Sequence, residues 1–147
     1  MSRSKKKVVF ATAMVLSLVI SACLVYGYGN QETHSLSGIT VIFSNSISTD
    51  LLSANASTWT GSPSTDAYVS ATFYWMNSIT GDFGSIFRSN GNYGAAYVSV
   101  SVNDIPNLDL AHFEGYTFYK VISNHIASYN GSTVFKNGLT IRTRDLP

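Results

Sequence analysis

The sequence has little cysteine and little charge. Cys23 is the only cysteine among 147 residues, and charged residues make up 12% of the chain, which is about half of the usual share. The region after Cys23 therefore has no disulfide, and its stability must come from packing and strand pairing. Serine, threonine, asparagine, glycine and tyrosine supply the polarity instead, which is typical of extracellular β-proteins and not of helical bundles.

Basic residues are scarce outside the N-terminus. Four of the nine, Arg3 and Lys5 to Lys7, precede the first apolar run, and beyond Cys23 five basic residues stand against eight acidic ones, a net charge of −3. Nucleic-acid binding needs several lysines or arginines on one face. We therefore expect no nucleic-acid partner.

Motifs for catalysis and for metal binding are also missing. The sequence contains no nucleophile elbow, His-Glu-x-x-His pattern, phosphate-binding loop or pair of closely spaced cysteines. His34, His112 and His125 are far apart, and two histidines without cysteines fall short of a zinc shell. We expect no enzyme activity and no cofactor. A secreted hydrolase remains an alternative if His112 or His125 meets a serine and a carboxylate in a cleft.

The N-terminus has the layout of an export signal. Lys5 to Lys7 form a positive region, and the apolar run 8–20 follows it directly. The sequence Ile20-Ser21-Ala22-Cys23 resembles a bacterial lipoprotein box, in which the cysteine receives the lipid. This resemblance implies lipid attachment at Cys23 and a place on the cell surface.

Two other fates of the leader stay open. The apolar character continues past Cys23 to Tyr28, so the leader can also be cleaved before Asn30, after Gly29. Alternatively, the 21 residues 8–28 are long enough to span a bilayer without cleavage. All three fates place the folded part outside the cytoplasmic membrane, either extracellular or at the cell surface.

The chain divides into three parts. Residues 1–23 are predicted to form the leader, whose apolar character can extend to residue 29, and residues 24–37, polar from Asn30 onward, are predicted to be a tether. Residues 38–147 are predicted to form a single β-domain.

Alternation of apolar and polar residues predicts strands along that domain. The longest such run, Ala67–Met76, places Val69, Ala71, Phe73 and Trp75 on one face, and we expect it to be the central strand. Further strands are expected at 38–44, 84–88, 95–102, 116–129, 132–135 and 139–143. A short helical turn is expected over 107–113.

Turn signals connect these strands. Asn130-Gly131 is the strongest two-residue hairpin signal, and Asn137-Gly138 marks either a second turn or a glycine bulge inside one long hairpin. About seven short strands at this spacing predict an all-β fold, either an antiparallel β-sandwich or a partly open barrel.

Two groups of residues are candidate binding sites. Tyr68, Tyr74 and Tyr97 fall on faces rich in serine and threonine, where tyrosines form adaptable contact surfaces. The competing interpretation is that they stabilise cross-strand pairs only. Asp104, Asp109 and Glu114 gather oxygen atoms in one short segment and form a weak calcium candidate, although their spacing differs from an EF-hand loop.

These observations predict an exported, non-enzymatic β-sandwich that acts by surface contact. Its partner would be an envelope component, a carbohydrate or a protein, and it would meet the membrane only through the N-terminal segment or a lipid. One alternative is a small secreted toxin or bacteriocin-like β-protein. The secreted hydrolase is the second.

Overall fold

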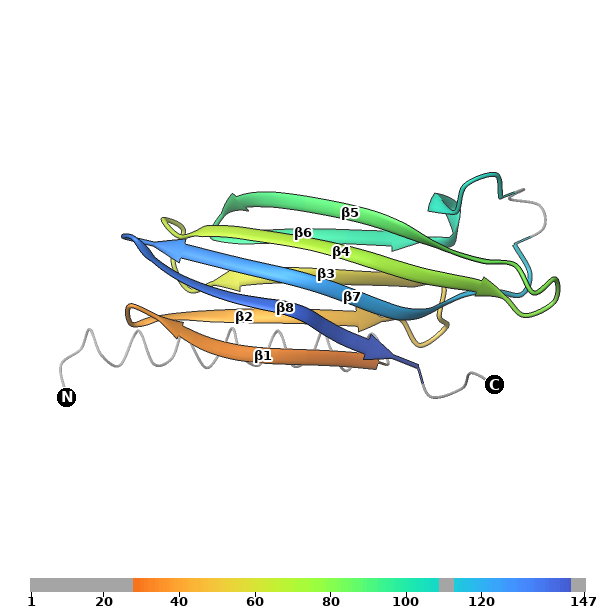
Figure 1. The fold of residues 1–147 in the computed structure, drawn as a ribbon, viewed down its shortest axis with the longest axis horizontal. Coiled ribbons are helices and arrows are strands. Elements are labelled where there is room, and N and C mark those ends of the chain that lie inside the picture. The colour runs from red at the N-terminus through yellow and green to blue at the C-terminus, as the bar shows by residue number, and fades with distance from the viewer. Residues whose placement is uncertain (1–27, 109–112, 144–147) are drawn as a thin grey trace.

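The computed structural model describes residues 28–108 and 113–143, which form two antiparallel four-stranded sheets stacked face to face (Figure 1). The strands are β1 (Tyr28–Leu36), β2 (Ile39–Ile47), β3 (Ser53–Thr60), β4 (Asp66–Asn77), β5 (Phe83–Tyr93), β6 (Ala95–Ser101), β7 (Tyr116–Tyr129) and β8 (Ser132–Arg142). A short 3-10 turn, η1 (Val102–Asp104), follows β6. Within the described residues, no helix is long and apolar enough to cross a bilayer.

Sheet A has the strand order β1-β2-β3-β6, and sheet B has the order β5-β4-β7-β8. The chain runs up and down, so the connections fall at two opposite ends (Figure 1). We call one the distal end, which holds the links β1–β2, β3–β4, β5–β6 and β7–β8. We call the other the leader end, because β1 begins there at Tyr28, and β8 finishes there as well.

The predicted tether is wrong for most of its length. Tyr28–Leu36, inside the predicted tether 24–37, is strand β1 and pairs with β2 from Tyr28 opposite Ile47 to Leu36 opposite Ile39. The strand was missed because it lies at a sheet edge, where polar residues are tolerated and backbone pairing suffices. The described body therefore begins at Tyr28 and not at residue 38, while Cys23 and the leader lie outside the described residues.

The central strand is confirmed. β4 lies between β5 and β7 in sheet B, and its inward residues Val69, Ala71 and Phe73 are at most 1% exposed. Trp75 is only partly buried, but it packs against the core as expected. Its ring fills the space above Gly84, because a Cβ atom added to that glycine would lie 2.5 Å from Trp75 Cζ2.

The last two strands form one long hairpin. Asn130 and Gly131 have φ angles of 48° and 78°, as a two-residue type I′ turn requires. The register shifts between Ser123 and His125, opposite Gly138, whose φ is 67°. Of the two alternatives for Asn137-Gly138, the glycine bulge is therefore correct, and Asn124 Oδ1 accepts a 3.0 Å hydrogen bond from the Gly138 amide.

Among the described residues the fold has eight strands and not seven, because β1 and β3 were not predicted and the predicted strands 132–135 and 139–143 form the single strand β8. β5 spans 11 residues instead of the predicted 84–88. Its sequence shows little apolar alternation because it is an edge strand that buries only Ile86. The predicted helical turn over 107–113 lies partly outside the described residues.

The interior contains two apolar clusters. The larger includes Phe73, Val69, Val98 and Phe118, and the smaller consists of Leu36, Val41, Phe43, Ala127 and Leu139. Along β2 the smaller cluster ends at Phe43 and the larger resumes at Ile47, with buried Asn45 between them. Along β7, Ser123 and His125 separate Val121 from Ala127 in the same way.

Candidate functional site

The three predicted tyrosines do not meet at one site. The strand register places Tyr68 and Tyr74 on the outer face of sheet B, whereas Tyr97 lies on β6 of sheet A, opposite Ser57. A single small ligand cannot touch all three, because the two sheets lie between them.

Tyr68 and Tyr74 both make cross-strand contacts. The Lys120 ammonium lies 4.4 Å from the centre of the Tyr74 ring, and the Tyr119 ring centre is 6.3 Å away. Tyr68 lies against Gly91, where an added Cβ atom would come within 3.4 Å of Tyr68 Cδ2. These contacts match the competing interpretation, in which tyrosines stabilise the sheet.

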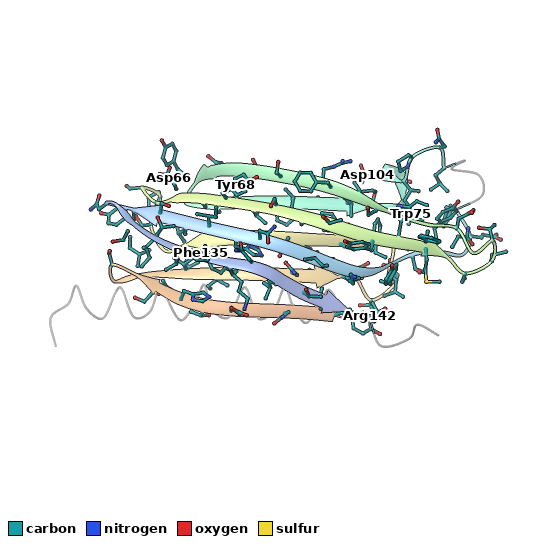
Figure 2. The ribbon with its side chains drawn as sticks, viewed as in Figure 1. Asp66, Tyr68, Trp75, Asp104, Phe135 and Arg142 are labelled. Atoms are coloured by element: carbon teal, nitrogen blue, oxygen red, sulfur yellow. The ribbon has the colours of Figure 1, made fainter. Side chains whose placement is uncertain are left out.

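Tyr68 also belongs to an exposed apolar row on sheet B. Tyr68, Ile126 and Phe135 are adjacent on β4, β7 and β8, with exposed fractions of 39%, 40% and 65%. Figure 2 shows Tyr68 and Phe135 over the same half of this sheet. We call these three residues the aromatic row. Its size makes it a candidate surface for contact with another protein.

A different pair of aromatic residues borders a hollow at the distal end. The segment Trp59–Pro63, which leaves β3, and the turn Tyr93–Ala95 between β5 and β6 line a cleft of about 410 Å³. We call this the distal cleft. It is shallow and largely open to solvent, so a ligand there would be held at the surface and not enclosed.

The walls of the distal cleft are fixed by hydrogen bonds. The Thr60 amide donates to the Gly94 carbonyl at 2.7 Å, and the Gly94 amide donates to the Thr65 carbonyl at 2.8 Å. The Thr60 hydroxyl bonds to the Ser62 and Gly94 carbonyls at 2.8 and 2.9 Å. Gly94 has a φ of 76° and packs against Pro63, so the two segments are held at a constant separation.

The distal cleft is uncharged. Its eight described lining residues include no lysine, arginine, histidine, aspartate or glutamate; they are Trp59, Thr60, Gly61, Ser62, Pro63, Tyr93, Gly94 and Ala95. Tyr93 is 69% exposed and Trp59 is half-buried. Aromatic rings beside hydroxyl and backbone groups suit a neutral ligand that has both apolar faces and hydroxyls.

His125 forms the centre of a buried polar network. Its Nδ1 lies 2.9 Å from the Thr58 hydroxyl, and its Nε2 lies 2.5 Å from the Ser123 hydroxyl. Ser123 also donates to Asn45 Oδ1, while Asn45 Nδ2 donates to the Leu139 carbonyl at 2.6 Å. We call Asn45, Thr58, Ser123 and His125 the polar belt, because they join both sheets between the two apolar clusters.

The imidazole in the polar belt is neutral in the fold. Burial lowers the pKa of His125 to about 4, partly opposed by the negative charge of Glu32, which raises it. Phe43 stacks on the His125 ring with centroids 5.1 Å apart. Glu32 itself is paired with Lys136 at 2.8 Å and with His34 at 3.4 Å.

This network meets only one of the conditions for a hydrolase. His125 does lie within hydrogen-bond reach of a serine, but both residues are 0% exposed. The other ring nitrogen contacts Thr58 and not a carboxylate. A nucleophile must reach a substrate carbonyl, and Ser123 has no surface with which to do so. His112 lies outside the described residues.

The calcium candidates are not gathered into a site among the described residues. Asp104 Oδ2 accepts hydrogen bonds from the Ser101 amide and hydroxyl, and Asp104 Oδ1 lies 3.5 Å from Arg88. Glu114 is exposed on another part of the loop, and Asp109 lies outside the described residues. The described part of the chain holds no cluster of three or more histidine, cysteine, aspartate or glutamate side chains suited to a metal.

The sequence pattern did not predict the distal cleft. Trp59 precedes the turn-forming stretch Gly61–Ser64, and Tyr93 precedes Gly94. An aromatic residue one or two positions before each of two turns is a signal, but the proximity of these two residues depends on the pairing of β3 with β6. Comparisons of the chain with family models, with curated proteins and with solved structures found no match, so these residues and their geometry are the basis for function.

Proposed function

We propose that this chain is an exported, non-enzymatic β-sandwich that binds a neutral carbohydrate in the distal cleft. The observation that carries the proposal is the uncharged hollow of about 410 Å³ between Trp59 and Tyr93. Aromatic rings stack on the C–H faces of sugar rings, and hydroxyl and carbonyl groups bond to the sugar hydroxyls.

Rigidity supports a binding role for the cleft. The hydrogen bonds among Thr60, Thr65 and Gly94 hold its walls before any ligand arrives, so little ordering entropy is lost on binding. The position of the cleft supports the same role. It lies at the end of the sandwich opposite Tyr28, and an anchor at the leader would direct it away from the membrane.

Contact with a protein through the aromatic row is the second candidate. Tyr68, Ile126 and Phe135 offer a continuous exposed row over three neighbouring strands. Replacing Ile126 and Phe135 with serine should abolish such contact, and retained contact in that double variant would count against it. The toxin and hydrolase alternatives have no comparable site among the described residues.

The carbohydrate proposal can be tested with a glycan array probed with the purified full-length chain. We expect binding to one class of neutral glycan, with at least about a tenfold loss of affinity in Trp59→Ala and in Tyr93→Ala, because each removes a stacking surface. Phe87→Ala is the matched control, since Phe87 is 61% exposed on sheet B and does not line the cleft.

Two results would contradict the proposal. One is an array on which no neutral glycan binds the chain. The other is glycan binding that survives both cleft substitutions unchanged. Thermal melting of each variant separates loss of binding from loss of the fold.

A further inference from the structure

Three large apolar side chains protrude from the leader end. Ile79 is 71% exposed, Phe83 is 80% exposed and Phe113 is 45% exposed. Ile79 and Phe83 come from the β4–β5 connection and the start of β5, and Phe113 comes from the loop before β7. We call these three residues the apolar tip. Exposed aromatic and aliphatic side chains on loops at one end of a molecule mark a contact surface.

The loops that carry the apolar tip are tied to one another. Asn77 is 3% exposed, and its side chain accepts hydrogen bonds from the Ile79 and Thr80 amides and donates to the Glu114 carbonyl. The Ser78 amide donates to the Gly115 carbonyl at 2.9 Å. The two loops therefore hold the apolar tip in a defined position, because hydrogen bonds to the buried Asn77 side chain fix the base of the tip.

The apolar leader joins the body at this same end. β1 begins at Tyr28, at the end of the sandwich where the β4–β5 and β6–β7 connections also lie, although these connections extend farther out than β1 (Figure 1). Cys23 is five residues before Tyr28. An extended chain of five residues spans at most about 17 Å. A lipid on Cys23, or a leader kept in the bilayer, would thus hold the leader end close to the membrane surface.

The charges near the tip indicate which kind of membrane surface suits it. Residues 78–83 and 102–115 contain no lysine or arginine, and Asp82 and Glu114 are exposed beside the apolar residues. An anionic surface would repel these carboxylates. A surface of zwitterionic headgroups accepts aromatic and aliphatic side chains at the interface without a basic patch.

We propose that the apolar tip of Ile79, Phe83 and Phe113 rests on the zwitterionic surface of the bilayer that holds the leader. This contact is independent of the distal cleft, which lies at the other end of the sandwich. It orients the domain, so that the cleft points away from the membrane. The short link between Cys23 and Tyr28 would give the tip a high local concentration at the bilayer, so even a weak apolar contact is occupied.

The test uses the full chain reconstituted in phosphatidylcholine vesicles, with a photoreactive benzoyl-phenylalanine in place of Phe83. After illumination, mass spectrometry measures the lipid adduct. The matched control carries the same group in place of Phe135, which is 65% exposed and lies far from the leader end (Figure 2). We expect at least about ten times more lipid adduct at position 83 than at position 135, because only the tip meets the interface.

Substitutions in the tip sharpen the test. Ile79→Ser and Phe113→Ser should lower the lipid adduct at position 83 several-fold, whereas Ile126→Ser on the opposite half of sheet B should not. Equal adduct yields at positions 83 and 135 would overturn the proposal. Adducts at position 83 that join two copies of the chain, without lipid, would overturn it as well. Neither result bears on glycan binding by the distal cleft.

Discussion

At the residue scale, His125 is the least expected feature of the interior. Burial makes its protonation unfavourable, and its two ring nitrogens lie within hydrogen-bond distance of the Thr58 and Ser123 hydroxyls. Such a network is favourable only in the one alignment of the two sheets that satisfies all its members. The polar belt therefore fixes how sheet A lies on sheet B, while the apolar clusters on either side supply the driving force.

The stability of the protein should fall in mild acid because of His125. Its pKa is lowered to about 4 in the fold from an ordinary value of 6.5. Below pH 6.5 the unfolded chain binds a proton that the folded chain does not, so the free energy of unfolding decreases as the pH falls. Between pH 7 and pH 5 we expect a loss of roughly 2 kcal/mol, measured by urea denaturation.

The choice of pH range separates His125 from the carboxylates. Glu32 and Asp50 have lowered pKa values, chiefly through hydrogen bonds with Lys136 and Ser48, so their stabilisation is lost only as the pH falls below 4.5 and 3.8. His125→Gln should be less stable at pH 7 but much flatter between pH 7 and pH 5. An equal decline in both proteins would show that His125 is not responsible.

Trp75 and Gly84 should be coupled in stability. A Cβ atom at residue 84 would lie 2.5 Å from Trp75 Cζ2, so Gly84→Ala should cost about 1–3 kcal/mol through overpacking. Trp75→Ala should cost about 3 kcal/mol, because the ring packs against the core. With Trp75 already replaced, Gly84→Ala should be nearly neutral.

Chemical denaturation of the two single variants and the double variant measures this coupling. Ser85→Ala is the control, since Ser85 is exposed beside Gly84 and should change stability by less than about 0.5 kcal/mol. Additive effects of the two substitutions would mean that the ring does not occupy the space above Gly84.

At the scale of elements, the turns determine where strands pair. The β7–β8 turn needs a positive φ at both Asn130 and Gly131. Gly131→Ala should therefore lower the free energy of unfolding by about 1 kcal/mol, because an L side chain is strained there. Gly61→Ala is the matched control, since its φ is ordinary and an added Cβ atom has no neighbour closer than 3.5 Å. Thermal melts that rank Gly61→Ala as the more damaging change would contradict this assignment.

The sequence was sufficient for most strands with two-residue alternation, but it missed the edge strand β1 and the interior strand β3 and shortened the edge strand β5. Ala67–Met76 alternates because its inner face is buried in the centre of sheet B, and β4 has those bounds within one residue at each end. β1 and β5 carry polar residues on both faces, since a sheet edge demands only backbone pairing. Their sequence pattern therefore predicted a tether where β1 lies and a short strand, 84–88, where β5 lies.

At the scale of the whole molecule, the two ends differ in chemistry. The leader end carries exposed Ile79 and Phe83, and the distal end carries an uncharged cleft between Trp59 and Tyr93. The up-and-down path of the chain creates this division, because successive connections alternate between the ends. Neither site could be predicted from the sequence, since each joins residues brought together by strand register and by sheet stacking.

The tyrosine prediction illustrates the same limit. Strand parity correctly placed Tyr68, Tyr74 and Tyr97 on outer faces, but it could not tell that they belong to two different sheets. Assignment of strands to sheets depends on long-range pairing, such as that of β3 with β6 across the two intervening strands. The alternation of residues within one strand does not show which other strand it pairs with.

Orientation on the membrane tests the account most directly. The same fluorescent non-natural amino acid would be placed at position 78 or at position 64 of the full chain, in vesicles that contain acceptor-labelled lipid. β7 alone has 14 residues, a length of about 46 Å, so energy transfer to the lipid should be strong from position 78 and weak from position 64. Equal transfer from both positions would contradict a sandwich that stands on its leader end and presents its cleft outward.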